Sequence, residues 1–250
     1  MTYHIVIPAR MASERLPGKA LLKIGRRTLI EWVCRRAEAS RARSVTVATD
    51  SDEIARAVKG FGARAVMTSE HHTSGSDRIA ECADIMGWSD DTLIVNLQGD
   101  EPLMPPACLD QVAGLAADDT RAAVASLYWP IEEEQELRDP NAVKVVTARD
   151  GAALYFSRSI IPHPRGGTLG ELTVPSWKRH IGLYAFRAGA LRAFSATPPT
   201  PLESMEKLEQ LRFLETGRRI AMAEACEMIP AGVDTPEDLE RVSALMSEES

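Results

Sequence analysis

The sequence has few cysteines, no long apolar run and no excess of basic residues, and each absence excludes a class of protein. The cysteines Cys34, Cys82, Cys108 and Cys226 form no CxxC pair and no other metal-ligand spacing, so we expect reduced thiols and no cysteine metal site. The net charge of −7 argues against a nucleic-acid-binding protein, which would carry a basic excess. A few local cations can still bind a small anion in an acidic protein.

Signals for export or membrane insertion are also missing. No apolar stretch approaches the roughly 20 residues that a membrane helix requires. The N-terminal apolar run is only Ile5-Val6-Ile7, and Pro8 follows at once, which is unlike a signal peptide. We therefore expect a cytoplasmic protein. The fingerprints G-x-G-x-x-G and G-x-x-x-x-G-K-[ST] are absent as well, so neither a dinucleotide motif nor a P-loop is predicted.

The composition is that of a globular protein. The 250 residues are 44% hydrophobic, which suffices for one large core, or for one core and a small lobe. The charged fraction of 26% argues against wholesale disorder. No internal repeat or low-complexity linker divides the chain. We therefore predict a single domain over residues 1–250, in which residues from about 120 to 190 contribute a smaller sheet-rich lobe.

Short apolar runs alternate with helical patterns in the first hundred residues. The runs at 5–7, 45–48, 63–67 and 93–97 predict strands. The patterns at 29–37, 54–58 and 79–86 predict helices, and Asp50 with Glu53 forms a predicted capping pair for the second of them. This alternation with short connections favours an α/β fold with a mainly parallel sheet.

The middle of the chain has a different pattern. Strands are predicted at 124–128, 143–147, 154–156 and 181–186, and few long helices separate them, so antiparallel pairing is expected there. Residues 162–170 are rich in Pro and Gly and predict a loop. Helical spacing returns at 204–214 and at 236–246.

The loop after the first predicted strand is the first candidate site. It places Arg10, Arg15 and Lys19 within ten residues, among small residues that let the backbone approach a ligand. A guanidinium group can donate two parallel hydrogen bonds to phosphate oxygens, and a lysine adds a compact positive charge. A triphosphate would therefore suit the loop. A solvated basic loop is the alternative interpretation of the same residues.

Two aspartates are candidate metal ligands. Asp100 follows a buried strand, at the sheet edge where the basic loop is also expected, and could hold Mg²⁺. Asp234 precedes a helical pattern with Pro236 near its first turn. Asp100 could equally cap the segment that follows it, and Asp234 taken alone is better explained as an ordinary helix start.

Other candidates are ambiguous when taken singly. Residues 74–78 form a small-residue turn at the start of a helix, which could face an anion or simply cap the helix. His180 and Tyr184 alternate along one strand and would share a face, although a strand histidine is more often structural. Arg158 could bind a carboxylate or lie on the surface, and Glu209-Gln210 alone resembles an exposed polar pair.

Nine motifs in order carry a family resemblance that no single motif would carry. They are Ile7-Pro8-Ala9-Arg10, Arg15-Leu16-Pro17-Gly18-Lys19, Val47-Ala48-Thr49-Asp50, Ser74-Gly75-Ser76-Asp77-Arg78, Asn96-Leu97-Gln98-Gly99-Asp100-Glu101-Pro102, Ala152-Ala153-Leu154-Tyr155-Phe156-Ser157-Arg158, His180-Ile181-Gly182-Leu183-Tyr184, Leu208-Glu209-Gln210-Leu211-Arg212 and Gly232-Val233-Asp234-Thr235-Pro236-Glu237-Asp238. From about residue 3 to residue 242, the chain resembles the 3-deoxy-manno-octulosonate cytidylyltransferase family.

The resemblance implies a fold and a reaction. The fold would be a Rossmann-like nucleotidyltransferase core with a smaller sheet-rich lobe that helps to form a homodimer. The reaction would be Mg²⁺-dependent transfer of CMP from CTP to 3-deoxy-manno-octulosonate (Kdo), giving CMP-Kdo for lipopolysaccharide synthesis and releasing pyrophosphate. Alternatives are the same reaction on another ulosonic acid, such as sialic acid or amino-Kdo, and a non-catalytic nucleotide-binding protein. A hexose-1-phosphate nucleotidyltransferase is disfavoured, since its usual loop carries glycine where this chain has Arg10.

The resemblance also implies residue roles. Those of the nucleotide site would be Ala9, Arg10, Arg15, Lys19, Ser74, Gly75, Arg78 and Asp100. Those of the sugar site would be Gln98, Arg158, His180, Tyr184, Glu209 and Gln210. Asp100 and Asp234 would hold Mg²⁺, and the catalytic residues would be Arg15, Lys19, Asp100 and Asp234.

Three residues of the phosphate loop depart from the family pattern. Met11 stands where tyrosine is common, Glu14 where a small hydroxyl residue is expected, and Ala20 where proline is expected. A carboxylate inside the loop would repel a triphosphate. We therefore expect Glu14 to face solvent or to pair with a nearby cation.

Overall fold

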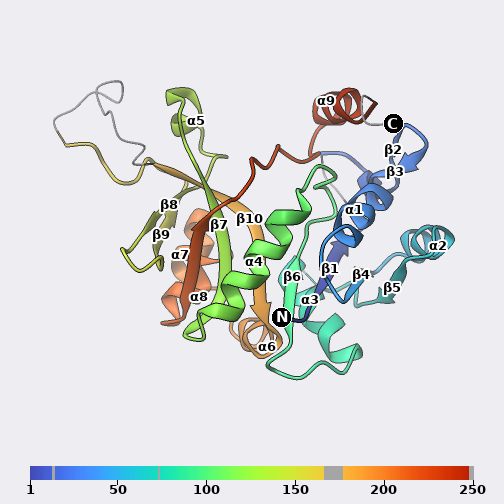
Figure 1. Cartoon of the computed structure of the whole chain (residues 1–250), viewed down its shortest axis with the longest axis horizontal. Helices are drawn as coiled ribbons and strands as arrows, with labels where there is room; N and C mark the ends of the chain where they lie inside the picture. The colour runs from blue at the N-terminus through green and yellow to red at the C-terminus, as the bar shows by residue number, and fades with distance from the viewer. Residues whose placement is uncertain (13–14, 73, 166–176, 248–250) are drawn as a thin grey trace.

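A twisted central sheet organises the molecule (Figure 1). The computed structural model describes the chain except for residues 13–14, 73, 166–176 and 248–250. Within the described part, the strands follow one another across the sheet in the order β11-β7-β10-β6-β1-β4-β5. They are β1 (Tyr3–Ala9), β4 (Ser44–Thr49), β5 (Arg64–Met67), β6 (Leu93–Asn96), β7 (Ala122–Pro130), β10 (Lys178–Arg187) and β11 (Arg219–Glu224).

The half of the sheet formed by the first hundred residues is parallel. Strand β1 pairs in parallel with both β4 and β6, so that Ile5 lies opposite Val45 on one side and Val95 on the other. Strand β5 extends this half in parallel beside β4. Strand β10 then runs antiparallel to β6 and β7, and β11 is parallel to β7. The predicted α/β fold with a mainly parallel core is therefore confirmed.

Residues 120–190 contribute to the central sheet as well as extending it. Strands β8 (Lys144–Thr147) and β9 (Ala153–Ser157) form an antiparallel pair that joins β10 at Arg179 and Lys144. Strands β7 and β10 from the same region lie within the main sheet. The sheet-rich part of this region is thus continuous with the core, and its role in dimerisation stays a prediction.

Helices cover both faces of the sheet. Successive strand residues point to opposite sides, so neighbouring residues of one strand pack against different helices. Ile5 and Ile7 of β1 pack with helices α1, α2 and α4, whereas Val6 packs with α3, α6 and α8. The helices are α1 (Leu29–Glu38), α2 (Asp52–Gly60), α3 (Gly75–Ile85), α4 (Pro106–Asp118), α5 (Glu134–Arg138), α6 (Ala188–Ser195), α7 (Pro201–Glu206), α8 (Leu211–Glu215) and α9 (Pro236–Ser247). The remaining elements are the short helix η1 (Lys19–Leu21) and the hairpin strands β2 (Lys23–Ile24) and β3 (Arg27–Thr28). Within the described residues, no helix is long and apolar enough to span a membrane.

Two details differ from the sequence-based predictions. The capping oxygen of α2 belongs to Ser51, which accepts a hydrogen bond from the Ile54 amide, so the pair Asp50 and Glu53 was the wrong choice. The helix predicted over 204–214 is split into α7 and α8 because Lys207 adopts a left-handed conformation, with φ of 55°.

Strand β11 and helices α4 and α6 were not predicted at all. Of the loop predicted at 162–170, residues 162–165 are irregular as expected, and the rest lies outside the described residues.

Candidate active site

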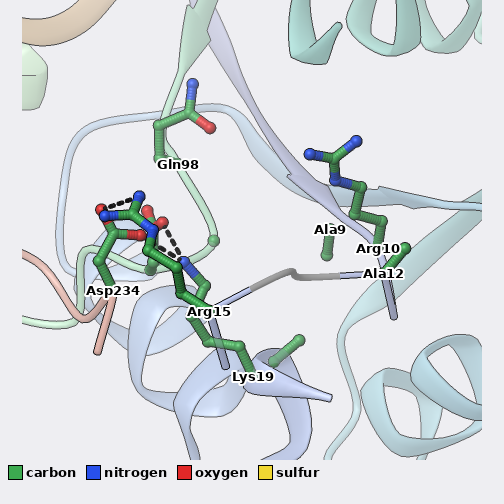
Figure 2. Close-up of a pocket in the computed structure, with 10 residues that line it drawn as sticks. Ala9, Arg10, Ala12, Arg15, Lys19, Gln98 and Asp234 are labelled. Carbon is green, nitrogen blue, oxygen red and sulfur yellow. Dashed lines mark hydrogen bonds and ion pairs between the residues drawn. The ribbon is translucent and has the colours of Figure 1, made fainter. Parts of the chain in front are cut away.

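A pocket of about 390 Å³ opens where β1 and β6 end (Figure 2). Its walls come from the loop after β1, from the segment after β6 and from the segment before α9. The lining residues are Ala9, Arg10, Ala12, Arg15, Lys19, Ala20, Gln98, Gly99, Asp100 and Asp234. The structure therefore brings together the basic loop and both aspartates that the sequence singled out.

Lys19 is the central residue of this pocket. Its Nζ lies 2.6 Å from Oδ2 of Asp100 and 3.0 Å from Oδ1 of Asp234. Burial opposes the charged form of Lys19, but the two carboxylates outweigh this effect and raise the pKa of Lys19 above its ordinary value. The amine is therefore a permanent cation at neutral pH and links two carboxylates from distant parts of the chain.

Arg15 approaches the same cluster from the solvent side. Its guanidinium lies 3.0 Å from Oδ2 of Asp234, and its side chain is 67% exposed, compared with 16% for Lys19. Figure 2 shows Arg10 across the pocket from this cluster. Cationic groups thus lie on two sides of the cavity, as a polyanionic ligand requires.

The loop that carries these cations is closed by its own backbone. The amide of Gly18 donates to the carbonyl oxygen of Met11 at 3.3 Å. Gly18 has a φ of 66°, a left-handed conformation that favours glycine, and it directs the chain into helix η1, where Lys19 is the first residue. Glu14, predicted to face solvent or pair with a cation, lies outside the described residues.

Asp234 is held by the capping interactions of α9. The carboxylate of Asp238 accepts hydrogen bonds from the backbone amides of Asp234 and Thr235, each at 3.1 Å. Burial of Asp238 opposes its ionisation, but these bonds and Arg241 outweigh it and lower the pKa of Asp238. The main chain at Asp234 is therefore fixed, while its side chain points into the pocket.

A second pocket of about 190 Å³ adjoins the first and shares Ala9, Arg10 and Gln98 with it. Its other lining residues are Pro8, His72, Ser74, Gly75, Arg78 and Glu209. Ser74 caps α3 by accepting a hydrogen bond from the Asp77 amide at 3.1 Å. This arrangement places the N-terminus of an eleven-residue helix at the pocket, which favours an anionic ligand.

Arg78 makes buried contacts that the sequence did not predict. Its guanidinium lies 2.5 Å from Oδ2 of Asp50 and 2.6 Å from the hydroxyl of Thr68, and its side chain is only 4% exposed. These partners follow β4 and β5. Arg78 thus ties α3 to the ends of two strands, and its predicted contact with the nucleotide stays a prediction.

The structure places the predicted sugar-site residues in different surroundings. Gln98 lines both pockets, and Glu209 lines the second, where it accepts a hydrogen bond from Ser76 at 2.9 Å. Gln210 is buried at the start of α8. These residues, together with His180, Tyr184 and Arg158, come from four separate segments of the chain.

His180 and Tyr184 lie together on β10, as their spacing predicted, with ring centroids 5.3 Å apart. Nε2 of His180 lies 3.0 Å from the hydroxyl of Ser126, and burial lowers the pKa of His180 to about 3. Tyr184 pairs in register with Asn96, two residues before Gln98, which brings β10 to the edge of the site. His180 also lines a separate groove of about 880 Å³ with Glu101 and Gly232.

Arg158 is engaged with the main chain. Its guanidinium donates to the carbonyl oxygens of Glu206 at 2.8 Å and Pro140 at 3.0 Å, and its own amide donates to the Glu206 carboxylate. These bonds join the end of β9 to the α7–α8 connection. Direct contact between Arg158 and a sugar carboxylate stays a prediction.

Glu101 is a buried acid beside both aspartates to which sequence reasoning gave no role. Its Oε2 is buried without a hydrogen-bond partner among the described residues. Burial, followed by the charges of Asp100 and Asp234, raises the pKa of Glu101 to about 8. The position of Glu101 directly after Asp100 was the available sequence signal. His72, which lines the second pocket, had no such signal.

Together, the fold and the site define a class of enzyme. A cation-rich pocket at the carboxyl ends of parallel strands, with two carboxylates at its edge, is the arrangement expected for a nucleotide-binding transferase. The chain matches the cytidylyltransferase family over residues 4–220. It is therefore an enzyme of nucleotidyl transfer.

Comparison with individual proteins narrows this class. The chain is 50% identical to the 3-deoxy-manno-octulosonate cytidylyltransferase of Thioalkalivibrio sulfidiphilus, covering 98% of this chain and 99% of the other. It is 47% identical to the corresponding protein of Saccharophagus degradans, with 98% of each chain covered. The chain belongs to the 3-deoxy-manno-octulosonate cytidylyltransferase family.

Solved structures agree with this assignment. A CMP:2-keto-3-deoxy-manno-octonic acid synthetase complexed with CTP is 40% identical and superposes with a TM-score of 0.91, covering 100% of this chain and 99% of the other. A 4-diphosphocytidyl-2C-methyl-D-erythritol synthase, at 14% identity and a TM-score of 0.65 over 98% of this chain and 100% of its own, shares the fold.

Proposed function

We propose that this enzyme transfers CMP from CTP to Kdo and releases pyrophosphate. The observation that carries the proposal is the cluster of Lys19 with Asp100 and Asp234 at the edge of the first pocket. It is supported by relatives named for this activity at about half identity over almost their whole length. It is also supported by the related synthetase structure at 40% identity, which is a complex with CTP.

The reaction asks the protein to position two anions and to neutralise their charge. The anomeric hydroxyl oxygen of the sugar forms a bond to the α-phosphorus, and the bond between that phosphorus and the bridging oxygen of pyrophosphate breaks. No covalent nucleophile from the protein is required. Arg15 and Lys19 would bind the pyrophosphate as negative charge develops on it, and Arg10 would contact the triphosphate from the opposite wall.

The side chains at the pocket edge suit Mg²⁺. Asp100 and Asp234 provide hard oxygen donors and already share one cation, the Lys19 ammonium. Mg²⁺ is commonly bound by one or two carboxylates and completes its shell with substrate phosphate and water. Bound there, Mg²⁺ would supply charge neutralisation and a lowered hydroxyl pKa.

Recognition of the sugar would involve the second pocket and β10. Gln98 and Glu209 both reach this pocket and offer hydrogen-bond groups to sugar hydroxyls. His180 is neutral at pH 7 because burial lowers its pKa, so it would orient a hydroxyl and would not carry charge. Tyr184 and Gln210 would form part of the same sugar site, and Arg158 would bind the sugar carboxylate.

Release of pyrophosphate from CTP tests the proposal. The assay is run with Mg²⁺ and Kdo, and each of the two is then omitted in turn. Release that depends on both supports the proposal. Release with sialic acid or amino-Kdo, but not with Kdo, would change the sugar and keep the reaction. Folded protein that binds CTP but releases no pyrophosphate with any of these sugars would contradict the proposal.

Two further properties belong to the same proposal. CTP is a cytoplasmic metabolite, so we place the enzyme in the bacterial cytoplasm, where CMP-Kdo would supply lipopolysaccharide synthesis. A homodimer follows from the family resemblance, with the sheet-rich part of residues 120–190 at the interface. Sedimentation equilibrium tests the dimer, since the 27.3 kDa chain would sediment at twice its mass.

A further inference from the structure

The two aspartates of the site are joined through their backbones. The amide of Val233 donates to the carbonyl oxygen of Asp100 at 2.8 Å, so the segment before α9 lies directly against the segment after β6. The side chain of Val233 is fully buried with Ile24 and Leu29. This contact therefore fixes the separation between the main chains that carry Asp100 and Asp234.

Gly232 lies at the closest point of this contact. A Cβ added there would lie 2.7 Å from the carbonyl oxygen of Asp100, and 3.1 Å from Cδ and Oε1 of Glu101. The first distance is shorter than any normal carbon–oxygen contact, and the atom it meets belongs to the backbone. The φ of Gly232 is not in the left-handed region, so lack of space, not backbone conformation, explains the glycine.

The surroundings leave no easy way to relieve such a clash. Glu101 is wedged against Gly232, with one carboxyl oxygen buried, and Asp100 is bonded to Lys19. Val233, the next residue, is fully buried against Ile24 and Leu29, which limits movement of this segment. A methyl group at residue 232 would therefore displace the segment that leads to Asp234 and move the second carboxylate away from the first.

We propose that Gly232 is a positioning residue that sets the distance between the Asp100 and Asp234 carboxylates for a divalent cation. The inference rests on the proposed function, which assigns Mg²⁺ to these two residues. Gly232 would touch neither substrate nor metal, and would act only by letting the two segments meet. Residues that orient metal ligands in this way change metal affinity by about 10–100-fold when they are substituted.

The test measures metal binding directly. Mn²⁺ is titrated into protein saturated with CTP, and its binding is followed by water-proton relaxation. Gly232→Ala is expected to fold, to bind CTP normally in EDTA, and to weaken Mn²⁺ binding by about 10-fold or more. Raised Mg²⁺ should restore part of its rate of pyrophosphate release.

Two matched variants separate positioning from general damage. Gly114→Ala adds a methyl group at a site where nothing lies within 4 Å, so it should bind Mn²⁺ as the wild type does. Val233→Ala removes core packing without adding bulk at residue 232. It should lower the melting temperature and leave Mn²⁺ affinity within about twofold of the wild-type value.

Asp100→Asn tells the two possible failures apart. If Asp100→Asn binds Mn²⁺ as tightly as the wild type, the metal assignment is wrong, and the inference built on it is overturned. If Asp100→Asn weakens binding and Gly232→Ala does not, only the positioning role is overturned. A Gly232→Ala protein that does not fold would also overturn it, because the proposal requires a folded enzyme with a displaced carboxylate.

Discussion

The ammonium of Lys19 lies 2.6 Å from the carboxylate of Asp100, although 81 residues separate them in the chain. The same ammonium reaches Asp234, which is 215 residues away. One largely buried cation thus links the phosphate loop to both candidate metal ligands. Changes at any of these three residues should therefore affect charge in the whole cluster.

Replacing Asp100 by Asn should abolish most of the activity without unfolding the protein. The change keeps the shape of the side chain and removes the charge that would hold Mg²⁺. We expect the rate to fall by about 10²-fold or more, which corresponds to at least about 2.7 kcal/mol of barrier. Steady-state pyrophosphate release measures the rate, and circular dichroism checks the fold. Asp91→Asn, on the exposed surface, is the control. Activity above half the wild-type value would remove Asp100 from the metal site.

Lys19→Met should be more damaging than Arg15→Met. Lys19 is largely buried and contacts two carboxylates, whereas Arg15 is mostly exposed and contacts one. An exposed ion pair is screened by water and contributes little, so we expect kcat/KM to fall by about 10-fold for Arg15→Met and by about 10²-fold for Lys19→Met. The comparison uses kcat/KM for CTP. An equal loss of kcat/KM for the two variants, or a larger loss for Arg15→Met, would show that burial does not determine which cation matters more for catalysis.

Much of the fold could be predicted because it depends on local patterns. The run Ile5-Val6-Ile7 is apolar without alternation because both faces of β1 are covered by helices. Strand β11 escaped prediction because Ala and Met, which favour helices, occupy its centre. The break at Lys207 was invisible because a left-handed residue other than glycine is uncommon and has no reliable sequence signal.

The site could be predicted only in part. Family motifs indicated Lys19 and both aspartates, and the structure brings these residues together. The partners of Arg78 could not be found in the same way, since Asp50 and Thr68 follow other strands and pair with it only in the folded chain. Local spacing gives the order of candidate residues along the chain but not their partners across the sheet.

Arg78→Met should reduce stability more than a surface substitution. The change leaves Asp50 without its cation and Thr68 without its donor in a largely buried setting. Breaking a buried ion pair costs about 3–5 kcal/mol, and we expect about 3 kcal/mol here because Asp50 keeps some exposure. Urea unfolding at pH 7 measures the loss. Arg56→Met, on the exposed face of α2, should change stability by less than about 0.5 kcal/mol. Similar stability of the two variants would contradict a structural role for Arg78 and favour a direct contact with the nucleotide.

His180 should make the protein less stable as the pH falls from 7 to 5. Its folded-state pKa of about 3 lies below the ordinary value of 6.5, so between these values the unfolded chain binds a proton that the native protein does not. The stabilisation is therefore complete above pH 6.5 and is lost progressively as the pH falls toward 3. Between pH 7 and pH 5 the loss should be about 1–2 kcal/mol.

Urea unfolding of the wild type and of His180→Gln isolates this contribution, because their other ionisable groups are the same. The difference in free energy of unfolding between the two proteins should become smaller as the pH falls from 7 to 5. The His180 ring should show no NMR titration in that range. A ring that titrates near pH 6.5 would contradict the lowered pKa of His180 and the pH dependence derived from it.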